Sequence, residues 1–318
     1  MNGSGLDFEK PILELERKID ELKRLTETEK IDLSAEIEQL TQRLESLKRQ
    51  VFAELSAWQR VQIARHPQRP YTLDYINLMM KDFIEVHGDR LFSEDKAIVC
   101  GLAKIDDQKL LVIGHQKGRD TKENLMRNFG CAHPEGYRKA IRLMKLAEKF
   151  NLPIVIFIDT PGAYPGVGAE ERGQAQSIAY NLREMTAIGV PIVIFVIGEG
   201  GSGGALGIGI GDRVSILENS YYSVISPEGC AAILWRDRNK APQAAEDLQL
   251  SAQHLLAMGI VDEIIKEPSG GAHRDPQVAA DNIKEAIKRS LPPLQALSRE
   301  QLLDARYQRF RKLAVFEE

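Results

Sequence analysis

The segment Pro153-Ile-Val-Ile-Phe-Ile-Asp159 is apolar up to its last residue, and Val190-Pro-Ile-Val-Ile-Phe-Val-Ile-Gly198 repeats the pattern later in the chain. Apolar runs of this length without alternation are typical of strands buried on both faces of a sheet. Between them, residues 169–187 have the spacing of an amphipathic helix. We therefore predict a strand, helix, strand unit with the right-handed crossover that such units favour.

The sequence on either side of this unit also predicts strands that alternate with helices. Two strands are expected at 97–105 and 109–114, paired around a turn at 106–108. Further strands are expected at 213–217, 221–226 and 260–266, with a helix that opens at Pro227. A turn-rich loop at 267–276 precedes two final helices, so the predicted fold class is α/β.

The N-terminal part differs, because apolar residues recur there at spacings of three and four over long stretches. We predict two helices joined near residues 26–30 as an antiparallel hairpin, with Asp32 or Ser34 capping the second. The second helix would end at His66-Pro-Gln-Arg-Pro70, because each proline disfavours helix in the residue before it. The predicted domains are therefore 1–70 and 71–318, and the hairpin is either a clamp on the subunit or a coiled-coil contact with a partner. The apolar positions are Ile12, Leu15, Ile19 and Leu22, then Ile37, Leu40, Leu44, Leu47, Val51, Leu55 and Trp58.

The composition is that of a globular protein: 318 residues, 43% hydrophobic and 28% charged, with a formal net charge of -4. Nucleic acid is an unfavourable partner for a chain without an overall basic field. Three widely spaced cysteines, Cys100, Cys131 and Cys230, match neither a zinc site nor a disulfide framework. We expect reduced thiols, no metal, no membrane anchor or signal peptide, and a cytoplasmic protein.

Two glycine-rich segments follow the two buried strands, where α/β sheets bind ligands. The first is Ile158-Asp-Thr-Pro-Gly-Ala-Tyr-Pro-Gly-Val-Gly-Ala-Glu-Glu171. Its glycines at 162, 166 and 168 leave backbone N–H groups unobstructed, and a helix begins after them. The segment favours an anion, although a structural turn would have the same composition.

The second segment, Ile197-Gly-Glu-Gly-Gly-Ser-Gly-Gly-Ala-Leu206, runs into a helical pattern. Inside a helix, glycine lowers stability by roughly 1 kcal/mol relative to alanine. Glycines at this position therefore indicate that the backbone comes close to another group. Backbone N–H groups aimed at a developing oxyanion would explain them. Close packing of the helix on a strand is the alternative.

Other motifs fit this second segment less well. The Gly-Lys-Ser/Thr ending of a P-loop is missing, and no acidic residue completes a dinucleotide fingerprint. Gly200-Gly-Ser-Gly-Gly204 does match the nucleophile elbow of serine hydrolases, and Asp262 and His273 follow in the order of a triad, although His273 falls in a loop that looks flexible. A serine hydrolase using Ser202 therefore stays open, as does a non-catalytic scaffold whose glycine segments only pack.

Basic residues gather in Gly114-His-Gln-Lys-Gly-Arg-Asp-Thr-Lys122, directly after a predicted strand. Lys117, Arg119 and Lys122 would suit a carboxylate or phosphate near the glycine segments. A solvated basic turn is the alternative. No pair of acids has a spacing that identifies a general acid and base.

Taken together, the residues resemble the alpha subunits of acetyl-coenzyme A carboxylase carboxyltransferases. The resemblance is carried by Ile158–Arg172, by Gly198–Leu206 and by Ser223-Val-Ile-Ser-Pro-Glu-Gly-Cys230. It extends from Leu-Asp-Phe-Glu at the N-terminus to Arg306-Tyr-Gln-Arg309 and includes Arg65–Tyr75. The matching runs are long and ungapped, which makes them more specific than any single glycine pattern.

The resemblance implies a crotonase (ClpP-like) superhelix of strand, strand, helix units. It implies carboxyl transfer from carboxybiotin to acetyl-coenzyme A, giving malonyl-coenzyme A for fatty acid biosynthesis. The implied partners are a beta subunit in an α2β2 assembly, the biotin carboxyl carrier protein and biotin carboxylase. Zinc would belong to the beta subunit and biotin would be attached to another protein.

The resemblance also assigns roles to particular residues. The N–H groups of Gly203 and Gly204 would form an oxyanion hole, with Gly162 and Ala163 on the opposite wall. Ser202 would be a small residue in a turn and not a nucleophile. Together with the glycine and basic segments, this gives a predicted substrate-binding set of Gly162, Ala163, Gly166, Gly200, Gly201, Lys117 and Arg119.

Overall fold

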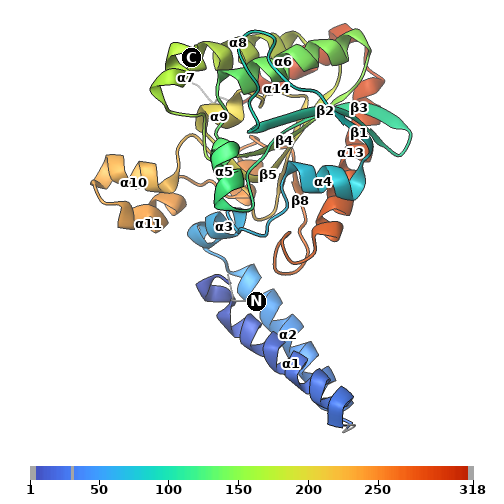
Figure 1. Ribbon diagram of the computed structural model, residues 1–318, viewed down its shortest axis with the longest axis vertical. Coiled ribbons are helices and arrows are strands. Elements are labelled where there is room, and N and C mark those ends of the chain that lie inside the picture. Colours follow the sequence, from blue (N-terminus) through green and yellow to red (C-terminus); the bar gives the residue numbers. More distant parts are fainter. Residues whose placement is uncertain (1–4, 30–31, 314–318) are drawn as a thin grey trace.

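The computed structural model describes residues 5–29 and 32–313, which fold around a single sheet (Figure 1). The eight strands follow the order β1-β2-β3-β4-β5-β6-β8, and β7 pairs with β5 outside this path. The described strands are β1 Lys81–Glu85, β2 Ile98–Ile105, β3 Gln108–His115, β4 Ile154–Thr160, β5 Ile192–Gly201, β6 Arg213–Leu217, β7 Tyr221–Ser223 and β8 Glu263–Ile265.

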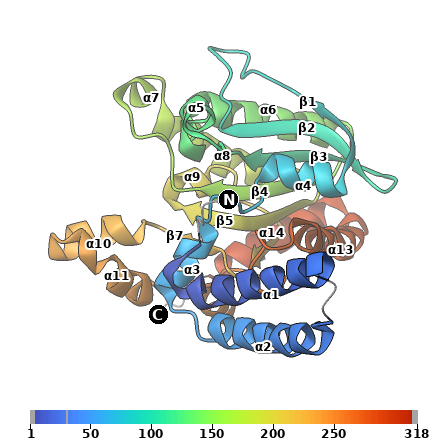
Figure 2. The same cartoon turned by 60° about the horizontal axis from the view of Figure 1, so that its bottom comes forward.

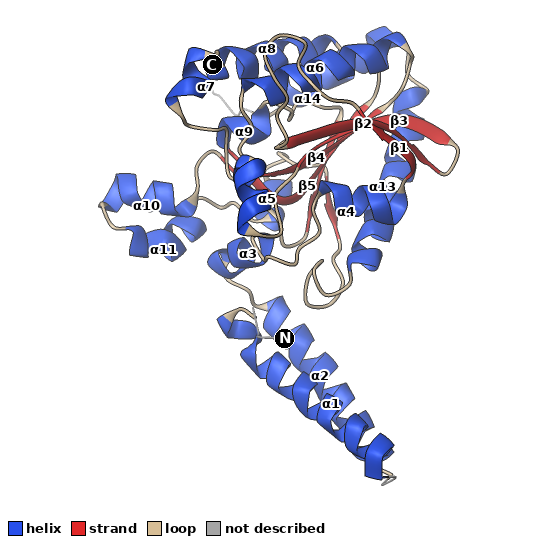
Figure 3. Cartoon of the chain, viewed as in Figure 1, coloured by secondary structure: helices blue, strands red, loops and turns tan. Residues whose placement is uncertain are grey.

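Helices surround this sheet and form the N-terminal extension (Figure 3). The described helices are α1 Lys10–Glu29, α2 Ser34–Ala53, α3 Ala57–Ala64, α4 Thr72–Met79, α5 Thr121–Met126, α6 Pro134–Lys149, α7 Val167–Glu171, α8 Gln174–Ala187, α9 Ser202–Leu206, α10 Pro227–Trp235, α11 Ala241–Asp247, α12 Ala252–Ala257, α13 Pro276–Gln295 and α14 Arg299–Arg311. Short 3-10 helices lie at Asp7–Glu9 (η1), Asn128–Gly130 (η2) and Arg238–Lys240 (η3). No described helix has both the length and the apolar character needed to cross a membrane.

The predicted strand, helix, strand unit is confirmed. Strands β4 and β5 are parallel, with Ile154 opposite Ile192 and Phe157 opposite Phe195. The expected hairpin is also present, since β2 and β3 pair antiparallel from Ile98 opposite His115 to Ile105 opposite Gln108. The sheet is therefore antiparallel across β1, β2 and β3 and parallel from β3 to β8.

The central strands are buried on both faces, as their uniform apolar character predicted. Ile154, Ile156 and Ile158 of β4 join a core cluster with residues of α6. Val155 and Phe157, which point to the opposite face, join a second cluster with residues of α4 and α13. This alternation places one helical layer on each side of the sheet, and the parallel pairing of β4 with β5 brings their carboxyl ends to a common edge (Figures 1 and 3).

The N-terminal hairpin of α1 and α2 is present and extends away from the sheet (Figures 1 and 2). Ile12, Ile19 and Leu44 form its buried core. The predicted second helix differs from the structure in two respects. Its N-cap is Leu33 and not Asp32 or Ser34, although the Asp32 side chain accepts the Ser34 N–H. The chain also breaks after Ala53 and starts α3 at Ala57, with Ser56 accepting a hydrogen bond from the Gln59 N–H. The apolar residues keep their helical spacing across this break. The backbone is nevertheless interrupted there, because Ser56 caps the start of a new helix.

A helix predicted for 169–187 is likewise divided. Gly173 has a left-handed backbone, φ +84, and separates α7 from α8. The later strands are shorter than predicted, since β7 ends at Ser223 and β8 covers only Glu263–Ile265.

The domain boundary at residue 70 stays a prediction. Helix α3 packs against β5, β7 and α11 of the larger domain, and Val61 and Ala57 join a buried cluster with Tyr221. We propose from this packing that the hairpin unit ends near residues 54–56 and that α3 belongs to the larger domain.

Candidate functional site

The two glycine-rich segments meet at the carboxyl ends of β4 and β5. A Cβ placed on Gly204 would lie 2.3 Å from the carbonyl carbon of Gly162 and 2.6 Å from the nitrogen of Ala163. A Cβ on Gly201 would lie 2.2 Å from the carbonyl oxygen of Pro161. Distances this short exclude any side chain, so glycine at 201 and 204 allows the two backbones to touch.

The N–H groups of Gly203 and Gly204 belong to the first turn of α9. Nitrogens in the first turn of a helix have no partner within that helix, so both are available for an acceptor from outside. The wall opposite is open beside Gly162, because no heavy atom lies within 4 Å of a Cβ placed there. This arrangement can accommodate a small acceptor group next to main-chain donors.

A cavity of about 480 Å³ lies next to Gly203, whereas Gly204, Gly162 and Ala163 do not line it. Its walls are mainly apolar and come from α9, β7, α12 and the end of α14. The residues that line it are Ser202, Gly203, Leu206, Gly209, Val214, Tyr222, Ser223, Val224, Leu248, Leu255, Met258, Ile260, Arg309, Phe310 and Leu313. In this chain the cavity is open to solvent, since its lining residues Leu206 and Val224 are 40% and 79% exposed.

The remaining predicted glycines support the backbone path. Gly200 lies opposite Thr160 of β4 and Tyr222 of β7, and a Cβ there would lie 2.7 Å from Cδ2 of Tyr222. Gly166 is the N-cap of α7, and its Cβ would lie 2.4 Å from Cε1 of Tyr164. These glycines shape the segments without presenting a functional group.

The structure does not assemble the predicted serine-hydrolase triad. Ser202 is exposed and has a left-handed backbone, φ +49. The carboxylate of Asp262 accepts hydrogen bonds from the Val214 N–H and from Arg309. His273 is not in a flexible loop: its side chain is 2% exposed, stacks on His66 and lies 3.4 Å from Glu9. Both presumed partners of Ser202 are thus engaged elsewhere.

Lys117 lies at the edge of the site, in a buried ion pair and not at a surface open to substrate. Its Nζ is 2.7 Å from Oδ1 of Asp159 and 2.9 Å from Oε1 of Glu199. Burial opposes the charge, but these two carboxylates outweigh it and raise the pKa of Lys117 above its usual range. Its contacts therefore do not support the predicted binding of a substrate anion.

Glu199 connects Lys117 to a wider network. Its second oxygen, Oε2, accepts from Arg65 at 2.9 Å and from the Tyr221 hydroxyl at 2.7 Å. Arg65 in turn pairs with Glu228 of α10. Burial would raise the pKa of Glu199, but Lys117 and Arg65 lower it to about 2, so the carboxylate is ionised.

Arg119 is also held by other residues of the chain. Its Nη1 donates to the carbonyls of Pro67 and Arg69, its Nη2 pairs with Asp74, and its guanidinium stacks on Tyr71 at 4.0 Å. These contacts hold the segment before α4 and do not support a role in substrate binding.

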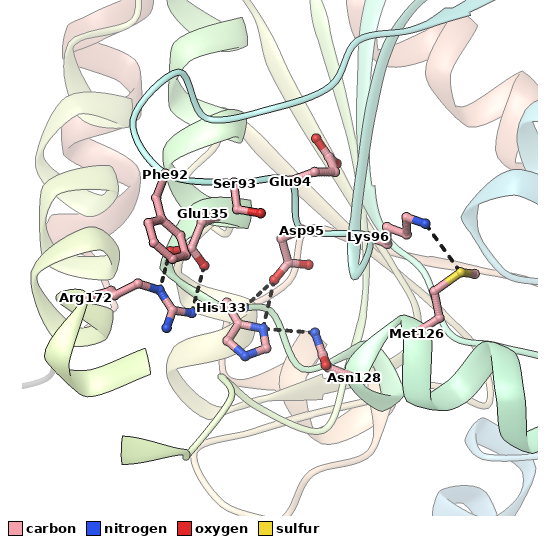
Figure 4. A pocket seen from close by; sticks show the side chains of 10 residues that line it. All are labelled: Phe92, Ser93, Glu94, Asp95, Lys96, Met126, Asn128, His133, Glu135 and Arg172. Atoms are coloured by element: carbon pink, nitrogen blue, oxygen red, sulfur yellow. Dashed lines mark hydrogen bonds and ion pairs between the residues drawn. The ribbon is translucent and has the colours of Figure 1, made fainter. Parts of the chain in front are cut away.

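A second cavity, of about 360 Å³, has polar walls and lies near the first glycine segment (Figure 4). His133 lies on one side, where its ring stacks on Tyr164 at 4.1 Å and its Nδ1 contacts Asn128 and Asp95. On another side, Arg172 pairs with Glu135. His133 and Asp95, like Arg172 and Glu135, pair with each other, whereas the exposed Lys96 ammonium contacts the Met126 sulfur at 3.5 Å (Figure 4).

Sequence reasoning missed Asp159, Glu199 and Arg65 as parts of the site. The first two had a signal, because each is an acid at the end of an otherwise apolar strand. A carboxylate in such a position is buried only when it is paired. Arg65 gave no signal, since its partners Glu199 and Glu228 are 134 and 163 residues away in sequence.

With this geometry established, comparison with known proteins gives consistent results. A protein family described as acetyl co-enzyme A carboxylase carboxyltransferase-like matches residues 5–314. The acetyl-coenzyme A carboxylase carboxyl transferase subunit alpha of Geobacter metallireducens is 58% identical over 313 residues, covering 98% of each chain. That of Thermus thermophilus is also 58% identical over 313 residues, covering 98% of this chain and 99% of the relative.

Solved structures of similar fold include transcarboxylase 12S, with a TM-score of 0.53, 21% identity, and coverage of 67% of this chain and 41% of that one. The beta subunit of Pseudomonas aeruginosa geranyl-CoA carboxylase gives a TM-score of 0.56 at 16% identity, covering 78% of this chain and 46% of that one. At such identities the likeness concerns the fold, which is that of the crotonase-like carboxyltransferases.

The chain belongs to the family of acetyl-coenzyme A carboxylase carboxyltransferase alpha subunits. It is thus a carboxyltransferase subunit of a biotin-dependent carboxylase that acts in fatty acid biosynthesis. The family resemblance read from the sequence and the predicted fold are both confirmed. The roles of individual residues are a separate question.

Proposed function

We propose that the N–H groups of Gly203 and Gly204 form the alpha side of the carboxyltransferase site, with Gly162 and Ala163 as the opposite wall. The supporting observation is the contact between the two segments, where a Cβ on Gly204 would lie 2.3 Å from Gly162. The complete reaction moves the carboxyl group of carboxybiotin, carried by a biotin carboxyl carrier protein, to acetyl-coenzyme A and gives malonyl-coenzyme A.

Carboxybiotin supplies the activated carboxyl group, and this chain supplies electrostatic stabilisation. Negative charge moves onto oxygen atoms during carboxyl transfer, and fixed N–H donors stabilise it more in the transition state than in the ground state. Each donor of this kind contributes about 2.7–4 kcal/mol in a site that excludes water. A partner subunit that covers the apolar cavity beside Gly203 would provide such surroundings.

The site is completed by a beta subunit in an α2β2 assembly, with biotin carboxylase as the further enzyme of the system. An exposed apolar surface on this chain supports a partner of this kind. Val224, Ile233 and Leu234 are 79%, 71% and 63% exposed, and the last two lie on α10, which projects with α11 from the body of the chain (Figures 1 and 2). Apolar side chains gathered on a projecting element are typical of a protein interface.

We further propose that the chain holds no metal of its own and works in the cytoplasm. Glu9, His66 and His273 have ligand atoms within 4.8 Å of one another. However, Nδ1 of His66 accepts the Gln68 N–H, so the proton of the neutral ring is on Nε2 and that nitrogen is not a metal ligand. The two imidazole rings are also stacked 3.9 Å apart, so their in-plane lone pairs do not converge. The cluster therefore does not fit a metal ion.

Reconstitution tests this proposal. The purified chain is mixed with a beta-type carboxyltransferase subunit, and decarboxylation of malonyl-coenzyme A is measured with and without free biotin. We expect activity that requires both subunits and biotin. Full activity of the chain alone, or turnover that does not depend on biotin, would contradict a biotin-dependent site shared by the two subunits.

A further inference from the structure

The two glycine segments begin where the regular pairing of β4 with β5 stops. Ile158 is opposite Val196, but the next pair is Thr160 with Gly200. Asp159 alone therefore faces residues 197–199 of β5. In a bulge of this kind main-chain hydrogen bonds no longer fix the distance between strands.

Side chains hold this gap together. Oδ1 of Asp159 accepts the backbone N–H of Glu199 at 2.9 Å, and a Cβ on Gly198 would lie 2.4 Å from the same oxygen. The Asp159 and Glu199 side chains are 1% and 8% exposed. Two carboxylates this close and this buried repel each other strongly unless a cation lies between them.

Lys117, which follows β3, provides that cation through contacts of 2.7 Å and 2.9 Å. Its side chain is 12% exposed. It also passes beside Gly130, where a Cβ would lie 3.0 Å from Cγ of Lys117. Arg65 reaches only the other oxygen of Glu199, so Lys117 is the group that joins both carboxylates.

We propose that Lys117 is a positioning residue for carboxyl transfer, which sets the separation between the Gly162–Ala163 and Gly203–Gly204 backbones. Each segment starts within a few residues of a carboxylate that Lys117 holds. The kinetic consequences of this proposal rest on the function proposed above, whereas the structural consequences do not.

Removal of the ammonium group leaves two facing carboxylates. Their repulsion separates the ends of β4 and β5 and shifts the Gly203 and Gly204 amides relative to Gly162. A displacement of about 1 Å in groups that act on the transition state costs about 100-fold in rate. Ground-state binding of substrate depends much less on these amides, so KM should change little.

The experiment compares Lys117→Met with the double variant Lys117→Met/Glu199→Gln, each in full-length chain reconstituted with a beta-type subunit. Lys104→Met is the matched control, because Lys104 pairs with Asp82 at 2.6 Å on the exposed β1–β2 edge. We expect kcat to fall about 100-fold in Lys117→Met, with KM within about threefold of wild type. The double variant removes one charge of each sign and should recover about tenfold of the lost kcat.

Two kinetic outcomes would overturn the proposal. An unchanged kcat in Lys117→Met means that the bridge does not position the amides. A raised KM at constant kcat, with no recovery in the double variant, means that Lys117 contacts substrate. If Lys117→Met does not fold, the double variant decides, because a wild-type kcat in a chain without the bridge also rejects the proposal.

A second measurement is independent of activity and separates this inference from the proposed function. Amide hydrogen exchange is followed in peptides that cover 160–166 and 198–206 of the purified chain. We expect at least tenfold faster exchange in both segments for Lys117→Met and no change for Lys104→Met. Equal exchange in Lys117→Met and wild type would refute the positioning role even if the reconstituted enzyme proved inactive for other reasons.

Discussion

The guanidinium of Arg69 and the carboxylate of Glu267 form an ion pair of 2.6 Å in which neither side chain is exposed. Arg69 also donates to the carbonyl of Ile197 in β5 at 2.7 Å, and Glu267 accepts the N–H groups of Asn219 and Ala272. The pair therefore links the segment before α4 to β5 and to the loop after β8, behind the second glycine segment.

This pair predicts a large loss of stability on removal of one partner. In Arg69→Met the Glu267 carboxylate stays buried without its cation, and we expect the free energy of unfolding to fall by about 3–5 kcal/mol. Urea denaturation of the purified chain measures this value. Lys284→Met is the control, since Lys284 pairs with Asp106 at the surface and should change stability by less than about 1 kcal/mol. Similar small losses in the free energy of unfolding for both variants would show that the buried pair contributes little to stability.

Buried carboxylates also predict acid sensitivity. Burial would raise the pKa of Glu267, but Arg69 and the hydrogen bonds from Asn219 lower it from 4.5 to about 2. The unfolded chain then binds protons before the folded chain does, so stability is complete above about pH 4.5 and is lost as pH falls toward 2. Glu199 and Glu9, with pKa values of about 2, act in the same direction.

The measurement is the urea midpoint as a function of pH. We expect it to be constant from pH 7 to about pH 5 and to fall steadily between about pH 4.5 and pH 3. A smaller pH dependence is expected for Glu267→Gln, which has one fewer carboxylate to protonate. A midpoint that does not change across the acidic range would contradict this account of the three carboxylates.

The exposed Ser202 separates the carboxyltransferase from the hydrolase hypothesis. Since Asp262 and His273 are engaged elsewhere, Ser202→Ala should keep carboxyl transfer within about threefold of wild type in reconstituted enzyme. A fluorophosphonate probe should leave Ser202 unlabelled, with a known serine hydrolase as the positive control. Labelling of Ser202 together with loss of activity in Ser202→Ala would restore the hydrolase hypothesis.

Local patterns were sufficient for the central strands but not for the edge strand β1 or for the helix breaks. The apolar runs 153–159 and 190–198 predicted β4 and β5, because runs of this length are typical of strands buried on both faces. The break at Ser56 was missed because the apolar period continues across it. Gly173 was read as an ordinary helical residue, although its positive φ separates α7 from α8.

The site shows the same limit more clearly. The density of glycines after buried strands drew attention to the two segments, whereas the roles of Gly162, Gly203 and Gly204 come from the family resemblance and stay predictions. The ion pairs of Lys117 were not predicted, since its partners lie 42 and 82 residues further along the chain. Ion pairs between residues this far apart in sequence depend on the tertiary fold, so a local pattern of charges cannot predict them.

The contact of Gly204 with Gly162 gives the most direct test of the central claim. In Gly204→Ala the new Cβ would lie 2.3 Å from a backbone carbon, so the two segments must separate and the amides must move. Gly168→Ala is the matched control in the same region, because its Cβ would meet only the flexible end of Arg172, at 3.2 Å. The measurement is kcat for biotin-dependent decarboxylation of malonyl-coenzyme A by chain reconstituted with a beta-type subunit. The account predicts a fall of about 100- to 1000-fold for Gly204→Ala and near wild-type activity for Gly168→Ala; wild-type kcat in a correctly folded and assembled Gly204→Ala enzyme would contradict it.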